Sequence, residues 1–140
     1  MRLIHVGGPT LLVETGGWRL LTDPTFDPPG RRYEFGLGCA GVREVARRFA
    51  VDTAVLHLGG VRFPATGPLR HTMTALDAVR LCRTLAARTV VPVHYEGWAH
   101  FREGRSAAEQ VLDRAPDGTA RRVRWLERGV PTEIDPQTGG

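Results

Sequence analysis

Two apolar runs that each end beside a histidine constrain the fold of this chain more than any other feature. Residues 53–58 form a nearly unbroken apolar run around His57, and residues 89–93 form a second run that leads directly into His94. Between them, residues 74–87 repeat apolar positions at helical spacing. This order predicts a β-α-β unit with two parallel strands and a right-handed crossover.

The carboxyl ends of two parallel strands lie at the same edge of a sheet, where open α/β folds keep their chemistry. We therefore expect His57 and His94 to lie at one edge. The turn after His94 is crowded with further polar and aromatic side chains, namely Tyr95, Glu96, Trp98 and His100. A lone histidine at such a place is often only a polar strand end, but this crowding makes His94 the first candidate for chemistry.

The N-terminal third is expected to hold three short strands, at residues 2–6, 10–14 and 18–22. The Gly16-Gly17 pair suits a two-residue hairpin turn between the second and third strands. The third strand leads into Asp23, and the prolines that follow exclude regular structure through Gly30. Asp23 precedes a proline, so capping a turn is its ordinary role.

Helical periodicity is also found at residues 42–49, before the first apolar run. Thr74 and Asp77 have the spacing of a capping box, and so do Ser106 and Glu109, which predicts two helix starts. The apolar face of the first of these helices is expected to comprise Leu76, Val79, Cys82, Leu85 and Ala86. The C-terminal part is expected to hold two short strands and a loose tail, at residues 122–126, 131–134 and 135–140.

Length and composition fit one compact domain, since the chain has 140 residues and is 41% hydrophobic. The first apolar run is too short for a signal peptide, and no stretch is long enough to span a bilayer, so a cytoplasmic protein without a membrane partner is expected. Cys39 and Cys82 form no CxxC pair and are expected to be reduced thiols, with Cys82 in the core.

All 19 basic residues are arginine, which is the residue usage of a GC-rich bacterial genome, so the formal charge of +4 need not indicate nucleic acid. The arginine pairs are scattered along the chain, without aromatic residues between them. A nucleic-acid partner is therefore not expected. Solvated arginine is the favoured interpretation of these residues, and anion binding is the alternative.

Several segments together resemble a known family. The segments are residues 3–14, residues 18–30 with the run Leu-Leu-Thr-Asp-Pro, residues 51–60, residues 73–79, and residues 91–98 with the run Pro-Val-His-Tyr-Glu-Gly-Trp. They resemble the metallo-β-lactamase-fold hydrolases, most closely the branch of ascorbate-6-phosphate lactonase-like proteins. The resemblance implies an αβ/βα sandwich with metal ions, usually zinc, at one edge between two sheets. It also implies that His94 matches the last metal-binding histidine of the family, and Asp23 a supporting aspartate at a strand end.

The other metal-binding motifs of the family have no counterpart in this sequence. Its five histidines include no pair separated by a single residue, so the His-x-His-x-Asp-His motif is absent, and no Gly-Asp-Thr occurs. The early family segment ends near Gly38 and the late one resumes near Gly41, which we interpret as an internal truncation of a single domain over residues 1–140. Because catalytic zinc needs about three protein ligands, weak or no zinc binding is expected.

These observations predict an α/β fold, a partial metallo-β-lactamase-like sandwich made of N-terminal strands and a C-terminal β-α-β unit. The expected function is that of a hydrolase-family member without independent hydrolase activity, and the sequence specifies no substrate. Two alternatives stay open: a metal-dependent hydrolase with a reduced or dimer-shared site from His57, His94 and His100, and an Arg-rich binding module. Truncation would uncover sheet edges and the apolar side chains of Leu76, Val79 and Leu85, so either a homo-oligomer formed through these edges or a loosely packed globule is expected.

Overall fold

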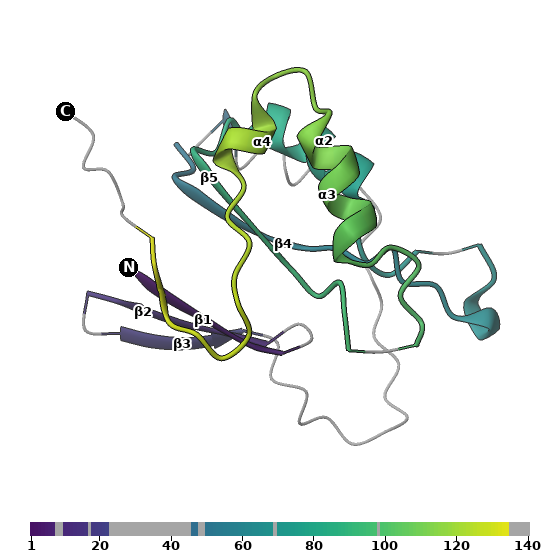
Figure 1. The fold of residues 1–140 in the computed structure, drawn as a ribbon, viewed down its shortest axis with the longest axis horizontal. Helices are drawn as coiled ribbons and strands as arrows, with labels where there is room; N and C mark the ends of the chain where they lie inside the picture. Colours follow the sequence, from purple (N-terminus) through teal and green to yellow (C-terminus); the bar gives the residue numbers. More distant parts are fainter. Residues whose placement is uncertain are drawn as a thin grey trace.

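The computed structural model describes residues 1–7, 10–16, 18–22, 46–47, 50–68, 70–97 and 99–134. Over these residues the chain forms three layers (Figure 1). An antiparallel sheet built mainly from the N-terminal strands forms one outer layer, a two-stranded parallel sheet lies in the middle, and helices cover the far side of the parallel sheet. The mixed α/β architecture predicted from the sequence is confirmed.

The antiparallel sheet has the strand order β3-β2-β1-β6. Its strands are β1 (Arg2–Gly7), β2 (Thr10–Thr15), β3 (Trp18–Thr22) and β6 (Thr132–Glu133). The three N-terminal strands and the short last strand are therefore confirmed. Leu3 pairs with Val13 and His5 pairs with Leu11, which places these four residues on the same face of the sheet.

The parallel sheet consists of β4 (Thr53–His57) and β5 (Thr89–Val93). The chain passes between them through the short 3₁₀ helix η1 (Pro64–Thr66) and the helix α2 (Ala75–Leu85). The register pairs Thr53 with Thr89 and His57 with Val93, so both strands end at the same level. The predicted parallel β-α-β unit is confirmed, and it brings His57 and His94 to one edge.

Two apolar clusters pack on the two faces of this parallel sheet. On the helical side lie Ala54, Leu56 and Val90 of the sheet, together with residues of α2 and of α3 (Arg105–Asp113). On the other side, Val91 and Val93 pack against residues of the antiparallel sheet and the C-terminal segment, namely Leu3, Leu11, Leu126 and Ile134. β5 is therefore buried on both faces, in accordance with its unbroken apolar sequence.

The buried face of α2 differs from the predicted one. The helix buries Ala75, Ala78, Val79 and Cys82. Leu76 was expected on the same face, but its side chain is 52% exposed, so that assignment is wrong. Val79 and Leu85 were expected to be uncovered together with Leu76, but Val79 is only 5% exposed and Leu85 packs against the core, so for these two residues the expectation is wrong. The small alanines allow α2 to pack closely on the sheet, which turns Leu76 toward solvent. Cys82 lies in the core as expected, and burial raises the pKa of its thiol.

The two predicted capping boxes have different outcomes. At α2, the Thr74 side chain accepts a hydrogen bond from the Asp77 backbone, and the Asp77 carboxylate accepts one from the Thr74 backbone, so the capping box is confirmed. At α3, Gly104 is the N-cap and no side chain caps the helix. The Ser106–Glu109 box is therefore wrong: the helix begins at Arg105, and the Glu109 carboxylate accepts a hydrogen bond from the Arg105 guanidinium at 2.8 Å.

The predicted strand at residues 122–126 is also wrong. The helix α4 (Thr119–Arg122) occupies its start, and only Val123 forms a bridge, parallel to Val90. Arg122 ends the helix by donating hydrogen bonds to the Ala87 carbonyl at 3.0 Å and the Thr119 hydroxyl at 2.9 Å. These tertiary contacts favour a helical turn over a strand.

Several predictions fall on residues that the structure does not describe. Of the expected helix at residues 42–49, only Ala46 and Arg47 are described, and both are helical. Asp23, Cys39, the proposed junction at residues 38–41 and the tail at residues 135–140 all lie outside the described residues. Among the helices that are described, none is long and apolar enough to cross a membrane.

The capping box at α2 generates a stability prediction. We expect Thr74→Ala to lower the free energy of unfolding by about 1 kcal/mol, because it removes the side-chain acceptor for the Asp77 backbone N–H. Thr84→Ala is the control, since this exposed hydroxyl of the same helix only donates to the Arg80 carbonyl at 3.2 Å. Urea denaturation measures both changes, and equal losses in the two variants would contradict the capping role.

Candidate functional site

The histidines at the end of the parallel sheet are adjacent. His57 is the last residue of β4 and His94 directly follows β5. Their ring centroids are 5.7 Å apart, with the ring planes inclined by 49°. The Nδ1 atom of His94 is buried. The backbone of His94 has a φ of +59°, a left-handed conformation that is uncommon for a residue other than glycine and is often found at functional sites.

Gly59 allows the turn after His94 to close onto the sheet edge. Its φ is +94°, and a Cβ atom at this position would lie 2.6 Å from Cδ1 of Phe101 and 2.7 Å from the carbonyl oxygen of His94. The Gly59 carbonyl accepts hydrogen bonds from the backbone N–H groups of Arg102 at 2.9 Å and Glu103 at 3.2 Å. Only glycine fits here, and its carbonyl fixes the segment that carries His100 and Phe101.

His100 is held apart from the histidine pair by an aromatic side chain. The ring of Phe101 contacts His94, with centroids 4.9 Å apart, and also contacts His100 at 5.0 Å. On its other side, His100 packs on Phe63 at 4.9 Å. His100 therefore connects the loop that carries Phe63 to the segment that carries Phe101 through ring packing. It is not part of the contact between His57 and His94.

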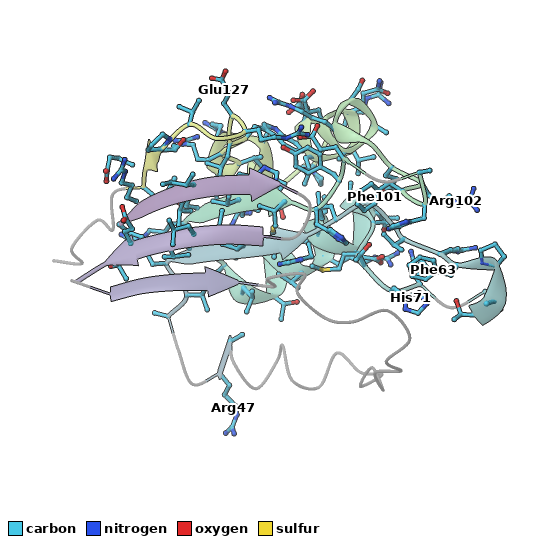
Figure 2. All side chains as sticks on the ribbon, turned by 90° about the horizontal axis from the view of Figure 1, so that it is seen from below. Arg47, Phe63, His71, Phe101, Arg102 and Glu127 are labelled. Atoms are coloured by element: carbon cyan, nitrogen blue, oxygen red, sulfur yellow. The ribbon has the colours of Figure 1, made fainter. Side chains whose placement is uncertain are left out.

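The loop between β4 and α2 is held in the same way. Phe63 and His71, both in this loop, lie close together (Figure 2), with ring centroids 5.0 Å apart and an edge-to-face inclination of 62°. The imidazole Nε2 of His71 also lies 2.9 Å from the hydroxyl oxygen of Thr66 in a hydrogen bond. The contacts of His71 are therefore structural.

Tyr95 and Glu96, the two residues that directly follow His94, have structural roles, and Trp98 lies outside the described residues. Tyr95 is 2% exposed, and its ring packs edge-on against Trp125 at 5.2 Å and lies 6.2 Å from His5. Burial, together with the charge of Glu96, raises the pKa of the Tyr95 phenol. The Glu96 carboxylate pairs with Arg128 at 2.8 Å on the surface. His5 is buried in the first strand.

The described residues do not supply the ligands of a catalytic zinc ion. Such an ion takes about three protein ligands and keeps an open position for water. Within the ranges that the structure describes, no group of three His, Cys, Asp or Glu side chains could hold a metal ion. His57 and His94 offer two nitrogen ligands, Phe101 lies between His94 and His100, and Asp23 is outside the described residues.

A hollow lined in part by arginine side chains lies beside this edge. Its volume is about 310 Å³, and it is lined by Gly60, Arg62, Arg70, Thr74, Arg102 and Glu103. The three arginines come from separate places in two loops, so no local motif marks them. Their proximity depends on how the two loops pack together.

Comparison with known proteins identifies the fold. No protein-family model matches the sequence. The chain is 22% identical over 139 residues to a curated UPF0173 metal-dependent hydrolase of Methanoregula boonei, a match that covers 81% of this chain and 57% of the relative. An isothiocyanate hydrolase from Delia radicum gut bacteria superposes with a TM-score of 0.54 at 20% identity, covering 67% of this chain and 35% of that one.

A second solved structure covers more of the chain. Igni18, a metallo hydrolase from the archaeon Ignicoccus hospitalis, superposes with a TM-score of 0.52 at 22% identity, covering 95% of this chain and 52% of its own. The chain has a metallo-β-lactamase-like fold. It spans about half the length of the curated relative and of Igni18, and about a third of the isothiocyanate hydrolase. Its sequence is distantly similar to that of a metal-dependent hydrolase.

The close contact at Gly59 generates a second prediction. Gly97 has nearly the same φ, +99°, with nothing within 4 Å of an added Cβ atom, so Gly97→Ala isolates the conformational cost of alanine at a positive φ. We expect Gly59→Ala to cost about 1–3 kcal/mol more unfolding free energy than Gly97→Ala, because its methyl group overlaps Phe101 and the His94 carbonyl. Urea melts of both variants test this, and equal losses would show that the turn is not packed on Gly59.

Proposed function

We propose that this chain is a metallo-β-lactamase-fold relative of the metal-dependent hydrolases that has no independent hydrolase activity. The observation that carries the proposal is the histidine pair at the sheet edge, His57 and His94, with no third metal ligand beside it among the described residues. The full sequence also lacks any His-x-His pair. A site with two protein nitrogen ligands is one short of the usual set for a catalytic zinc ion.

We also propose a closer relationship, to the ascorbate-6-phosphate lactonase-like branch, with the central part of the domain missing near residues 38–41. The early and late segments named above support this, because they follow the order of that family with a short junction between them. The length supports it as well, since the chain spans 57% of the curated relative and 52% of Igni18. In this interpretation His94 is the retained last metal-binding histidine.

One alternative function has an observation in its favour. His57 and His94 are close enough to share an ion, with ring centroids 5.7 Å apart, so a second polypeptide could supply the remaining ligands. The outer edge of β4 has no strand partner among the described residues, although the His57 carbonyl at its end accepts a hydrogen bond from the Met73 N–H at 3.2 Å. The earlier part of this edge, from Thr53, is left for a second copy of the chain. A dimer-shared metal site is therefore the second candidate.

Metal analysis separates the two candidates. We expect the purified chain, equilibrated with zinc near neutral pH and then dialysed, to retain clearly less than one zinc ion per two chains and to hydrolyse no ester or lactone faster than free zinc does. His94→Ala should abolish the weak zinc binding that remains, whereas His71→Ala should not, because His71 lies in the loop outside the pair. One zinc ion per two chains or more, with turnover that depends on His94, would instead establish the shared-site enzyme.

Self-association through the β4 edge has its own test. The Leu58 N–H donates to the Val93 carbonyl and the Asp52 carbonyl accepts from Thr89, so the backbone of Thr53 faces away from β5. We expect light scattering to show a mass that rises with concentration, and Thr53→Pro to shift the chain toward monomer by removing an outward N–H. Thr53→Ala keeps that N–H and should behave as the unmodified chain. A monomer at all concentrations would contradict pairing at this edge.

A further inference from the structure

We propose that a cluster of arginines around α4 is a docking surface for an acidic segment of a partner protein. This α4 arginine cluster comprises Arg83 of α2 together with Arg121, Arg122 and Arg124 in and directly after α4. Figure 1 shows α4 beside the start of β5, at the end of the parallel sheet that is opposite to the histidines. The proposal therefore does not depend on metal binding or hydrolysis.

Tertiary hydrogen bonds bring together arginines that are far apart in the sequence. The Arg124 N–H donates to the Val90 carbonyl at 2.8 Å, and Val123 forms a parallel bridge with Val90. The Arg122 guanidinium donates to the Ala87 carbonyl at 3.0 Å, just beyond the end of α2. These contacts hold α4 against the segment that joins α2 to β5. The arginines at the end of α2 and those of α4 therefore share one surface.

One carboxylate serves the whole cluster. Asp117 accepts a hydrogen bond from Nε of Arg83 at 3.0 Å and lies 3.9 Å from the Arg122 guanidinium. Arg121 and Arg124 are exposed, and the ion pairs of the part of the chain that the structure describes include neither of them. Four guanidinium groups against one carboxylate leave an excess of three positive charges. Several other surface arginines are matched one to one, namely Arg2 with Glu14, Arg105 with Glu109, and Arg128 with Glu96.

The carboxylate of Asp117 is already fully engaged. Its pKa is lowered to about 2, chiefly because the Thr119 hydroxyl donates a hydrogen bond to it, and further because Arg83 does so. Asp117 is therefore ionised throughout the neutral range, and it still offsets only one of the positive charges. The remaining excess is available to carboxylates of another molecule.

Backbone carbonyls hold two of the guanidinium groups in place. Arg122 donates to the Ala87 carbonyl at 3.0 Å, and Arg124 donates to the carbonyls of Arg121 and Val123 at 3.2 and 3.1 Å. These acceptors are neutral, so they restrain the side chains without cancelling their charge. A partner carboxylate then meets side chains that have already lost part of their rotamer freedom, which reduces the entropic cost of binding.

The chemistry of the cluster favours protein carboxylates over nucleic acid. Guanidinium groups donate paired hydrogen bonds that match a carboxylate. Single-stranded nucleic acid is bound largely by stacking bases on aromatic side chains. The ring of Trp125, next in sequence to Arg124, packs against Tyr95 at 5.2 Å and beneath Arg105 at 5.3 Å. Charge-driven binding to DNA uses about 6–10 phosphate contacts, more than a cluster of this size supplies.

The test titrates a short fluorescein-labelled oligoglutamate peptide with the intact chain and follows fluorescence anisotropy. We expect saturable binding that weakens as salt is added, with backbone NMR shifts confined to residues 83–90 and 117–124. Arg121→Gln combined with Arg124→Gln should weaken the affinity about fivefold or more, because two charge-assisted donors are lost. Arg62→Gln combined with Arg102→Gln removes the same charge near the other end of the parallel sheet and should change the affinity less than about twofold.

Two further measurements keep the test decisive. Arg121→Gln alone should weaken the affinity about twofold, and it leaves the backbone contacts of Arg122 and Arg124 in place, so it tests the surface without disturbing α4. Binding that does not saturate, or an equal loss of affinity in both double variants, would overturn the proposal. So would tighter binding of a thymidine oligonucleotide of the same net charge, weakened by the Arg121 and Arg124 double variant, because that result would indicate a nucleic-acid surface.

Discussion

Parallel pairing of β4 with β5, buried on both faces, is the constraint on which the rest of the structure depends. Val90, Val91 and Val93 are fully buried, and each fully buried valine stabilises the fold by about 1.5–3 kcal/mol relative to exposure. Val90 packs against the helices, and Val91 and Val93 pack against the antiparallel sheet. One strand therefore joins the two clusters, and its carboxyl end sets the position of His94.

The edge formed in this way has two neighbouring features with different chemistry. At the strand ends lie two histidines with ring centroids 5.7 Å apart. Beside them, the loops that follow β4 and β5 enclose an arginine-lined hollow. Gly59 and Gly60 serve both features: the first allows the His94 turn to close, and the second keeps the hollow open. The two consecutive glycines after β4 therefore determine how the loops pack along this edge of the sheet.

The β-α-β unit could be predicted from the sequence because two strand-length apolar runs flank a helical pattern, and topology then places both histidines at one edge. Finer features depend on tertiary contacts. The exposure of Leu76 follows from the close approach of Ala75 and Ala78 to the sheet, and the helical turn at Arg122 follows from its bonds to Ala87 and Thr119. The separation of His100 from His94 by Phe101 depends on the turn at Gly59. No local pattern encodes these contacts.

The central proposal is that this chain alone does not provide the ligand set of a hydrolytic metal centre. X-ray absorption at the zinc edge, on the chain loaded with less than one equivalent of zinc, tests this most directly because it identifies the atoms bound to the ion. The account predicts no more than two imidazole ligands from one chain, with light oxygen scatterers of water at the remaining positions. Three or more protein ligands on zinc bound to the monomer, with imidazole or thiolate among them, would contradict it.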